Sequence, residues 1–256
     1  MGPVVRLHRA KMNQQSIRCS EEYRPHPVGT IDLGEGFECL SAQLPPVPGT
    51  LDAALCSLSE DERARANRFV FAHDRDRFIM ARGLLRQLLG ERLGIAPKDI
   101  EFRYNQFGKP ELADQCGGNA LRFNVSHSED FVIFVFARGR QVGADIEAIR
   151  PLPDADEVAA RCFSPREIDA YRDLDEAMKP RGFFNCWTRK EAFVKAVGEG
   201  LGYRLSDFDV SLAPGDPAEI LRVGELENGN CGWRMFDIDG IPGFAGAVVI
   251  ESQNNS

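Results

Sequence analysis

The stretch FNCWTRKEAFVKAVGEGL, residues 184–201, combines a helical apolar pattern with charged groups that a plain surface helix does not require. Trp187, Glu191 and Lys195 are spaced four residues apart, so a helix places an indole, a carboxylate and an ammonium group on one face. A surface ion pair between Glu191 and Lys195 would contribute only about 0.3–0.5 kcal/mol. It would explain neither Trp187 nor the adjacent Lys190. A structural and a functional role for this helix both stay open at this point.

This helix belongs to the second copy of an internal repeat. Each half of the chain has a capping box, Ser59 with Glu62 and Ser164 with Glu167, and a long helix that ends in glycines. Sliding the chain by 108 residues (198 − 90) superimposes matching residues: Gly90 on Gly198, Arg82 on Lys190, Leu93 on Leu201, Gly94 on Gly202 and Asp99 on Asp207. Several matches at one offset predict a duplicated α+β unit.

We therefore predict an α+β fold built as a pseudo-twofold tandem of two similar α+β subdomains, with the active site in the cleft between them. Residues 1–28 lack clear periodicity and are expected to be an extension. The predicted subdomains are residues 29–141 and residues 142–256, and the second carries the metal site. Strands are expected at three segments: 121–128, 131–138 and 141–149. The middle strand is apolar at successive positions, as in a strand buried on both faces.

Composition excludes few functions. The chain has 256 residues, a net charge of −8 and a pI near 5.2, which argues against a general nucleic-acid-binding protein. No apolar run approaches the ~20 residues of a membrane span, and no signal-peptide core is present. The seven cysteines include no CxxC pair, so we expect neither a disulfide framework nor a zinc ribbon. These features favour a cytoplasmic protein without membrane contact.

The segment VGADIEAI contains two acids that a strand turns to one side. Asp145 and Glu147 share a face, while Ile146 points to the other. Two neighbouring carboxylates repel each other unless a cation lies between them, and Mg²⁺ or Mn²⁺ suits oxygen ligands. Solvated acids on an exposed strand are the alternative. Glu191 is a candidate third ligand, and Gly143 would let another group approach the strand.

Other polar residues are candidates for phosphate binding. Ser126 and His127 follow a strand in NVSHSED, where phosphate contacts and a turn or capping role are both possible. Lys109 lies in the stiff Gly-Lys-Pro turn of FGKPEL. A basic run lies on the helices of the first half, and a solvated surface is its alternative explanation: Arg68, Arg75, Arg77, Arg82 and Arg86.

Four of these segments occur in a family-specific order. FGKPEL, FNVSHS, VGADIE and WTRKEAFVK together resemble the 4′-phosphopantetheinyl transferase superfamily, in its larger, two-repeat Sfp-type branch. All four motifs match at every defining position, and the resemblance covers residues from about Leu51 to the C-terminus. Ala144 stands where a bulkier aliphatic residue is frequent in the family.

The resemblance implies a reaction and a role for each matching residue. Such enzymes move the phosphopantetheine arm of coenzyme A onto a serine of an apo carrier protein and release 3′,5′-ADP. Asp145, Glu147 and Glu191 would hold Mg²⁺, and Glu191 would act as the base. Lys195 would steady or protonate the leaving phosphate. The remaining expected phosphate contacts come from these residues: Ser126, His127, Lys109, Lys190 and, less firmly matched, Arg68, Arg75 and Arg82.

The resemblance also predicts the partner. An apo acyl or peptidyl carrier protein is expected, of the fatty-acid, polyketide or nonribosomal-peptide kind. Because carrier proteins are usually acidic, as this chain is, we expect a local docking patch that includes Arg161, Arg166 and Arg172. Two repeats in one chain predict a monomer. The alternatives are a non-catalytic coenzyme A-binding or carrier-docking protein of this fold and a Mg²⁺-dependent nuclease.

Overall fold

A computed structural model describes residues 29–33, 36–44, 50–224, 226–227 and 232–253. The expected N-terminal extension, residues 1–28, lies outside this part. The first half of the described chain runs through β1 (Gly29–Ile31), β2 (Phe37–Gln43), α1 (Thr50–Ser57), α2 (Glu60–Ala66), α3 (Ala72–Leu93), β3 (Phe102–Tyr104), β4 (Pro110–Leu112), β5 (Leu121–Ser128) and β6 (Phe131–Arg138). The second half runs through β7 (Val142–Ala148), α4 (Ala155–Cys162), α5 (Pro165–Arg172), α6 (Lys179–Val197), β8 (Phe208–Val210), β9 (Ile220–Val223), β10 (Leu226–Glu227), β11 (Trp233–Asp237) and β12 (Phe244–Glu251).

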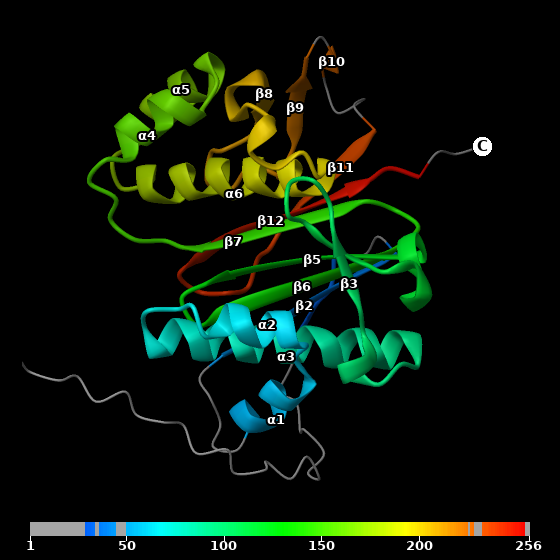
Figure 1. The fold of residues 1–256 in the computed structure, drawn as a ribbon. Coiled ribbons are helices and arrows are strands. Elements are labelled where there is room, and N and C mark those ends of the chain that lie inside the picture. The colour runs from blue at the N-terminus through cyan, green and yellow to red at the C-terminus, as the bar shows by residue number, and fades with distance from the viewer. Residues whose placement is uncertain (1–28, 34–35, 45–49, 225, 228–231, 254–256) are drawn as a thin grey trace, which may run out of the picture.

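Two main sheets lie between two long helices (Figure 1). The first sheet has the strand order β1-β2-β6-β5, and the second has the order β11-β12-β7. Helix α3 covers the outer face of the first sheet, and α6 covers the outer face of the second. A third apolar cluster, made of β6, β7 and β12 residues among others, fills the space between the sheets. The strands of the two main sheets are therefore the inner layers of the molecule.

The apolar run of β6 is buried on both faces, as its sequence predicts. Val132, Phe134 and Phe136 pack toward α3, whereas Ile133 and Val135 pack against the second sheet. Because successive side chains of a strand point to opposite faces, only a continuous apolar run can occupy this position. The strands predicted at 121–128 and 131–138 coincide with β5 and β6.

The duplication is confirmed by the order of elements and sheets. In the first sheet β2 pairs with β6 and β6 with β5, and in the second β7 pairs with β12 and β12 with β11. The predicted offset of 108 is wrong for the long helices. Gly94 ends α3 and Gly198 ends α6, both in the left-handed conformation, so the helices correspond at an offset of 104 (198 − 94). Gly90, one turn before the end of α3, produced the misalignment.

A buried ion pair at equivalent places in the two halves supports this corrected register. Arg86 Nε lies 2.7 Å from Glu62 Oε2, and Lys190 Nζ lies 2.7 Å from Glu167 Oε2. Arg86 also donates to the carbonyls of residues 97 and 100, and Lys190 to those of residues 205 and 208. Arg86, and not Arg82, is therefore the counterpart of Lys190. Both cations tie a long helix to the segment that follows it.

Two expectations from composition can be compared with the described residues. The cysteines among them lie outside any disulfide: Cys39, Cys56, Cys116, Cys162 and Cys186. Across the described ranges, no helix has both the length and the apolar character needed to cross a membrane.

Candidate active site

A cavity of about 330 Å³ lies where the two halves meet. It is lined by residues of β5, β7 and α6: Val125, Ser126, His127, Asp145, Glu147, Trp187, Glu191 and Lys195. Strand β5 belongs to the first half, whereas β7 and α6 belong to the second. Figure 1 shows α6 lying along β7, with β5 next to β7 on the side of the first sheet. The predicted cleft between the subdomains therefore contains residues of three of the four motifs: FNVSHS, VGADIE and WTRKEAFVK.

The alternation of β7 turns both acids toward the cavity. Asp145 and Glu147 lie on the α6 side, and Ile146 packs between the two sheets, as the spacing predicts. Gly143 makes this arrangement possible, because a Cβ there would lie 2.2 Å from both the Ala192 carbonyl oxygen and the Ala196 nitrogen. The missing side chain lets α6 lie directly on β7, and this close approach brings the Glu191 carboxylate to the same cavity.

The face of α6 that the sequence singled out is the face that lines the cavity. Trp187, Glu191 and Lys195 all contribute to its wall. The Trp187 ring stacks on Phe183 at a centroid distance of 6.2 Å and packs against the core of the second half. The indole thus fixes one side of the cavity, and the two charged groups one and two turns later form a charged part of its wall.

Hydrogen bonds connect the cavity residues to one another. Lys195 Nζ donates to Asp145 Oδ1 at 2.6 Å and to Ser126 Oγ at 3.3 Å. The Ser126 hydroxyl donates to the same Asp145 oxygen at 2.7 Å. Asp145 is therefore held on one oxygen by two donors, one of them charged. Its other oxygen, Oδ2, is buried and accepts no hydrogen bond from any residue in the described ranges.

The cavity is electrostatically unbalanced toward negative charge. Burial raises the pKa of Glu191, and the charges of Asp145 and Glu147 raise it further, while Lys195 opposes them. Burial also raises the pKa of Glu147. The pKa of His127 is lowered by burial and by the nearby positive charges of Lys195 and Arg77, so its imidazole is neutral at pH 7. Three carboxyl groups thus face a single ammonium group.

The donor set fits a hard divalent cation in kind. Three carboxyl groups line one cavity, and the unpartnered Asp145 Oδ2 is a buried acceptor that a cation would satisfy. In the described part of the chain, however, no three acidic, histidine or cysteine side chains are gathered closely enough to hold a metal. Asp145 Oδ1 instead contacts Lys195, and Glu147 Oε2 accepts a hydrogen bond from Ser128. The carboxylates would have to converge further around an ion.

Lys190 is not placed for the predicted phosphate contact. Its side chain is fully buried, and its ammonium group donates to Glu167 and to two backbone carbonyls. An ammonium group has three hydrogens, so these partners use all of them. Adjacent residues of a helix point in different directions, and Lys190 faces the core while Glu191 faces the cavity.

Lys109 connects the two halves instead of lining the cavity. Its ammonium group donates to the carbonyls of Lys195 at 2.5 Å and Val142 at 3.1 Å. In the same turn, Asn105 Nδ2 donates to the Gly198 carbonyl at 2.9 Å, at the end of α6. We refer to Asn105 and Lys109 as the clasp. Burial lowers the pKa of Lys109 to about 8.

None of the arginines predicted to bind phosphate lines this cavity. Arg68 is exposed at the end of α2, and Arg75 pairs with Asp76 at 2.9 Å. Arg82 lies 3.5 Å from Glu62 and over the ring of Phe102. They remain candidates only for parts of a ligand that extend beyond the cavity.

Sequence reasoning missed two residues beside the cavity. Ser128, the last residue of β5, donates to Glu147 Oε2 at 2.7 Å. Arg77 lies near His127, whose pKa it lowers, and pairs with Asp130 at 2.7 Å. The period of two along β5 could have indicated Ser128, because Asn124, Ser126 and Ser128 alternate with apolar or aromatic neighbours. No sequence signal distinguished Arg77 from the other arginines of the basic run.

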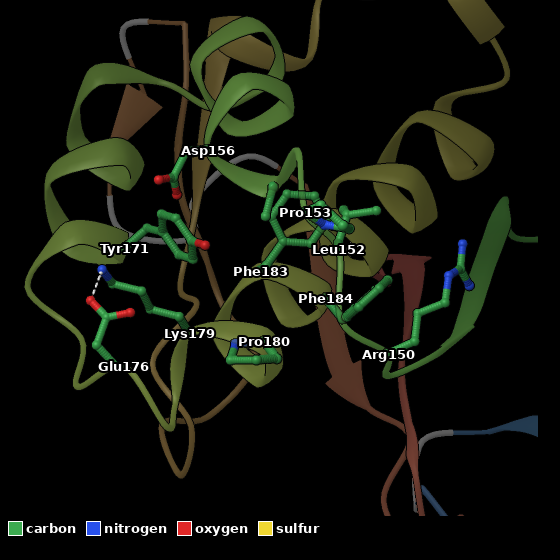
Figure 2. A pocket seen from close by; sticks show the side chains of 11 residues that line it. Arg150, Leu152, Pro153, Asp156, Tyr171, Glu176, Lys179, Pro180, Phe183 and Phe184 are labelled. Carbon is green, nitrogen blue, oxygen red and sulfur yellow. Dashed lines mark hydrogen bonds and ion pairs between the residues drawn. The ribbon is translucent and has the colours of Figure 1, made fainter.

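A second hollow of about 210 Å³ lies next to the cavity (Figure 2). Tyr171, Phe183 and Phe184 line it together with charged residues at its rim, among them Arg150 and the Lys179–Glu176 ion pair. Phe183 stacks on Trp187, so the hollow and the cavity share an aromatic wall. Helix α4 contributes Ala155 and Asp156 to the lining of the hollow, and α5 contributes Tyr171.

Comparisons with known proteins agree with the motifs. Residues 141–245 match the family described as the 4′-phosphopantetheinyl transferase superfamily, and residues 43–138 match the family described as 4′-phosphopantetheinyl transferase, N-terminal. The 4′-phosphopantetheinyl transferase HetI of Nostoc sp. strain PCC 7120 is 42% identical over 196 residues, which cover 77% of this chain and 82% of that protein. The 4′-phosphopantetheinyl transferase Sfp of Bacillus subtilis strain 168 is 30% identical over 193 residues, which cover 75% and 81%. The chain therefore belongs to the 4′-phosphopantetheinyl transferase superfamily, in its Sfp-type branch, and is a transferase.

Proposed function

We propose that the protein transfers the 4′-phosphopantetheine arm of coenzyme A to a serine hydroxyl of an apo acyl or peptidyl carrier protein and releases 3′,5′-ADP. The observation that supports this most strongly is the cavity between the halves, where Asp145, Glu147, Glu191 and Lys195 meet in a chain of this family. The serine oxygen forms a bond to the phosphorus that carries the pantetheine arm. The bond from that phosphorus to the bridging oxygen of the pyrophosphate breaks.

Glu191 is the proposed base for the serine hydroxyl. Its carboxylate lies in the wall of the cavity, one turn before Lys195 on α6, where it can accept a proton from a hydroxyl that enters the cavity. Lys195, one turn later on α6, is proposed to steady the leaving 3′,5′-ADP through its ammonium group. Ser126 and the imidazole of His127 are proposed to donate hydrogen bonds to phosphate oxygens.

Mg²⁺ is the proposed cofactor, and Mn²⁺ is an alternative of the same chemistry. Asp145, Glu147 and Glu191 would hold it, and the unpartnered Asp145 Oδ2 is the strongest support for this assignment. When bound, the ion would neutralise the negative charge that accumulates on the bridging oxygen as 3′,5′-ADP leaves. A single chain contributes both walls of the cavity, which supports a monomeric enzyme.

Release of 3′,5′-ADP tests this proposal. The protein is incubated with coenzyme A, Mg²⁺ and an apo carrier protein, and the nucleotide is quantified by chromatography. We expect release that needs the carrier and is lost with EDTA. Glu191→Gln should lower the rate by about 10²-fold or more, since it removes the base while preserving the size of the side chain. Full release with EDTA present would contradict the proposed cofactor.

The carrier is proposed to dock on α4 and α5. Arg161, Arg166 and Arg172 are exposed on these two helices, and the hollow in Figure 2 lies beneath them, beside the cavity. Charge reversal of all three arginines should raise the KM for an acidic carrier protein at low salt and leave kcat nearly unchanged. Arg138→Glu, at the opposite end of β6 from the cavity, is the control. An unchanged KM in the triple variant would contradict the proposal that the carrier docks on this surface.

A further inference from the structure

Where the two halves meet, side-chain hydrogen bonds between β5 and β7 take the place of backbone pairing between the strands. β5 is an edge strand of the first sheet and β7 is an edge strand of the second. The amide groups of β7 that face β5 donate to side chains of that strand. Ala144 N–H donates to Asn124 Oδ1 at 2.9 Å, and Ala148 N–H donates to Ser128 Oγ at 3.0 Å. Ile146 N–H makes a longer contact of 3.4 Å with Ser126 Oγ. We call these contacts the seam.

The seam also sets the direction of the serine hydroxyls. A hydroxyl that accepts a hydrogen bond from a backbone amide still has its own hydrogen to donate. Ser128 donates this hydrogen to Glu147 Oε2 at 2.7 Å, just as Ser126 donates to Asp145 Oδ1 at 2.7 Å. Each serine therefore connects the backbone amide of one β7 residue to the carboxylate of the residue before it. Asn124 makes the same backbone contact but has no such carboxylate partner among its hydrogen bonds in the described chain.

We propose that Ser128 is a positioning residue that aims the Glu147 carboxylate into the cavity from the other half of the molecule. Ser128 is buried and does not itself line the cavity, so it reaches the site through Glu147. A substitution of Ser126 would be a less specific test of positioning, because Ser126 also contacts Lys195 and lines the cavity itself. The inference rests on the proposed function in one respect, since it takes Glu147 to be a ligand of the divalent cation.

The expected size of the effect follows from side-chain freedom. Without the Ser128 hydroxyl, Glu147 would occupy several rotamers, and cation binding would have to order it. Ordering one flexible side chain weakens binding by roughly 2- to 12-fold. The hydrogen bond between Ser128 and Glu147 also joins residues of different halves. The orientation of the Glu147 side chain therefore depends on how the two halves pack along the seam.

The test is a titration with Mn²⁺ in the presence of saturating coenzyme A. The concentration of free Mn²⁺ is measured at each step by electron paramagnetic resonance. Ser128→Ala should weaken Mn²⁺ binding by roughly 2- to 12-fold, and Ser128→Thr, which retains the hydroxyl, should restore it. Asn124→Ala is the matched control, because it removes a seam contact of the same kind without touching a carboxylate. We expect both alanine variants to lower the Tm and only Ser128→Ala to lower the Mn²⁺ affinity.

Two results with the variants would overturn the inference. One is an unchanged Mn²⁺ affinity in Ser128→Ala, and the other is an equal loss in Asn124→Ala, which would mean that any loosening of the seam has this effect. Should Ser128→Ala fail to fold, Ser128→Cys keeps the side-chain volume with a much weaker donor and is expected to show the same loss. A wild-type protein that binds no Mn²⁺ would overturn the metal assignment itself and this inference with it. Normal wild-type binding with an unaffected Ser128→Ala variant would overturn the inference alone.

Discussion

At the scale of single residues, Lys195 neutralises a carboxylate that the proposed cation would need. Its ammonium group lies 2.6 Å from Asp145 Oδ1. In Lys195→Met this charge is lost and the cavity becomes more negative. We expect transfer to fall by about 10²-fold or more, because the ammonium group that steadies the leaving 3′,5′-ADP is lost. Mn²⁺ binding without coenzyme A should tighten by about 5-fold, on the order of 1 kcal/mol, as seen by calorimetry. Weaker Mn²⁺ binding in the variant would contradict this role.

His127 should take up a proton when coenzyme A binds. Burial and the charges of Lys195 and Arg77 lower its pKa, so the free imidazole is neutral near pH 6.5. A phosphate placed beside it favours the protonated form and raises the pKa again. Calorimetry of coenzyme A binding without metal, in two buffers of different ionisation enthalpy, should show uptake of a fraction of one proton. His127→Asn should abolish the difference between buffers, and equal enthalpies for the wild type would refute the assignment.

At the scale of elements, the site depends on how closely α6 lies on β7. In Gly143→Ala the new Cβ would meet the α6 backbone at 2.2 Å, so the helix must move away from the strand. We expect a loss of about 1–3 kcal/mol in the free energy of unfolding by urea. The transfer rate should fall as well, because Glu191 moves relative to Asp145. Gly202→Ala is the control, since its Cβ would meet Phe107 at 3.4 Å, an ordinary contact. Equal stability of the two variants would argue against this interpretation.

Local sequence patterns predict these elements well, because residues close together in the chain determine which side chains share a face and where a helix begins. The two acids of β7 and the three groups on α6 follow from the periods of a strand and a helix. The capping box of Ser164 and Glu167 begins α5 as expected. The phosphate contact predicted for Lys190 rests only on its position next to Glu191 in the sequence. One step along a helix turns a side chain by about 100°, and this residue faces the core.

At the scale of the whole molecule, the clasp should stabilise the union of the halves. In Lys109→Met, the carbonyls of Val142 and Lys195 lose a buried donor. We expect a loss of about 1–3 kcal/mol in the free energy of unfolding, measured with urea. Lys98→Met changes an exposed lysine of the same half and should be within about 0.5 kcal/mol of the wild type. Matching stabilities of the two variants would show that the clasp contributes nothing.

Long-range features could not be predicted from the sequence in this way. The duplication was visible, but its helix register was not, because Gly90 and Gly94 stand one turn apart and each resembles a helix end. The seam depends on how β5 faces β7, and no local pattern encodes that register. The same holds for Lys109, whose partners lie far along the chain, at the start of β7 and near the end of α6.

The most direct measurement is the intact mass of an apo carrier protein after incubation with this protein, coenzyme A and Mg²⁺. We expect a gain equal to one phosphopantetheine arm on the wild-type carrier, and no gain on a carrier whose acceptor serine is changed to alanine. The gain should be absent with EDTA and with Glu191→Gln. Coenzyme A that binds to the protein while neither an acyl nor a peptidyl carrier gains mass would contradict the proposed reaction.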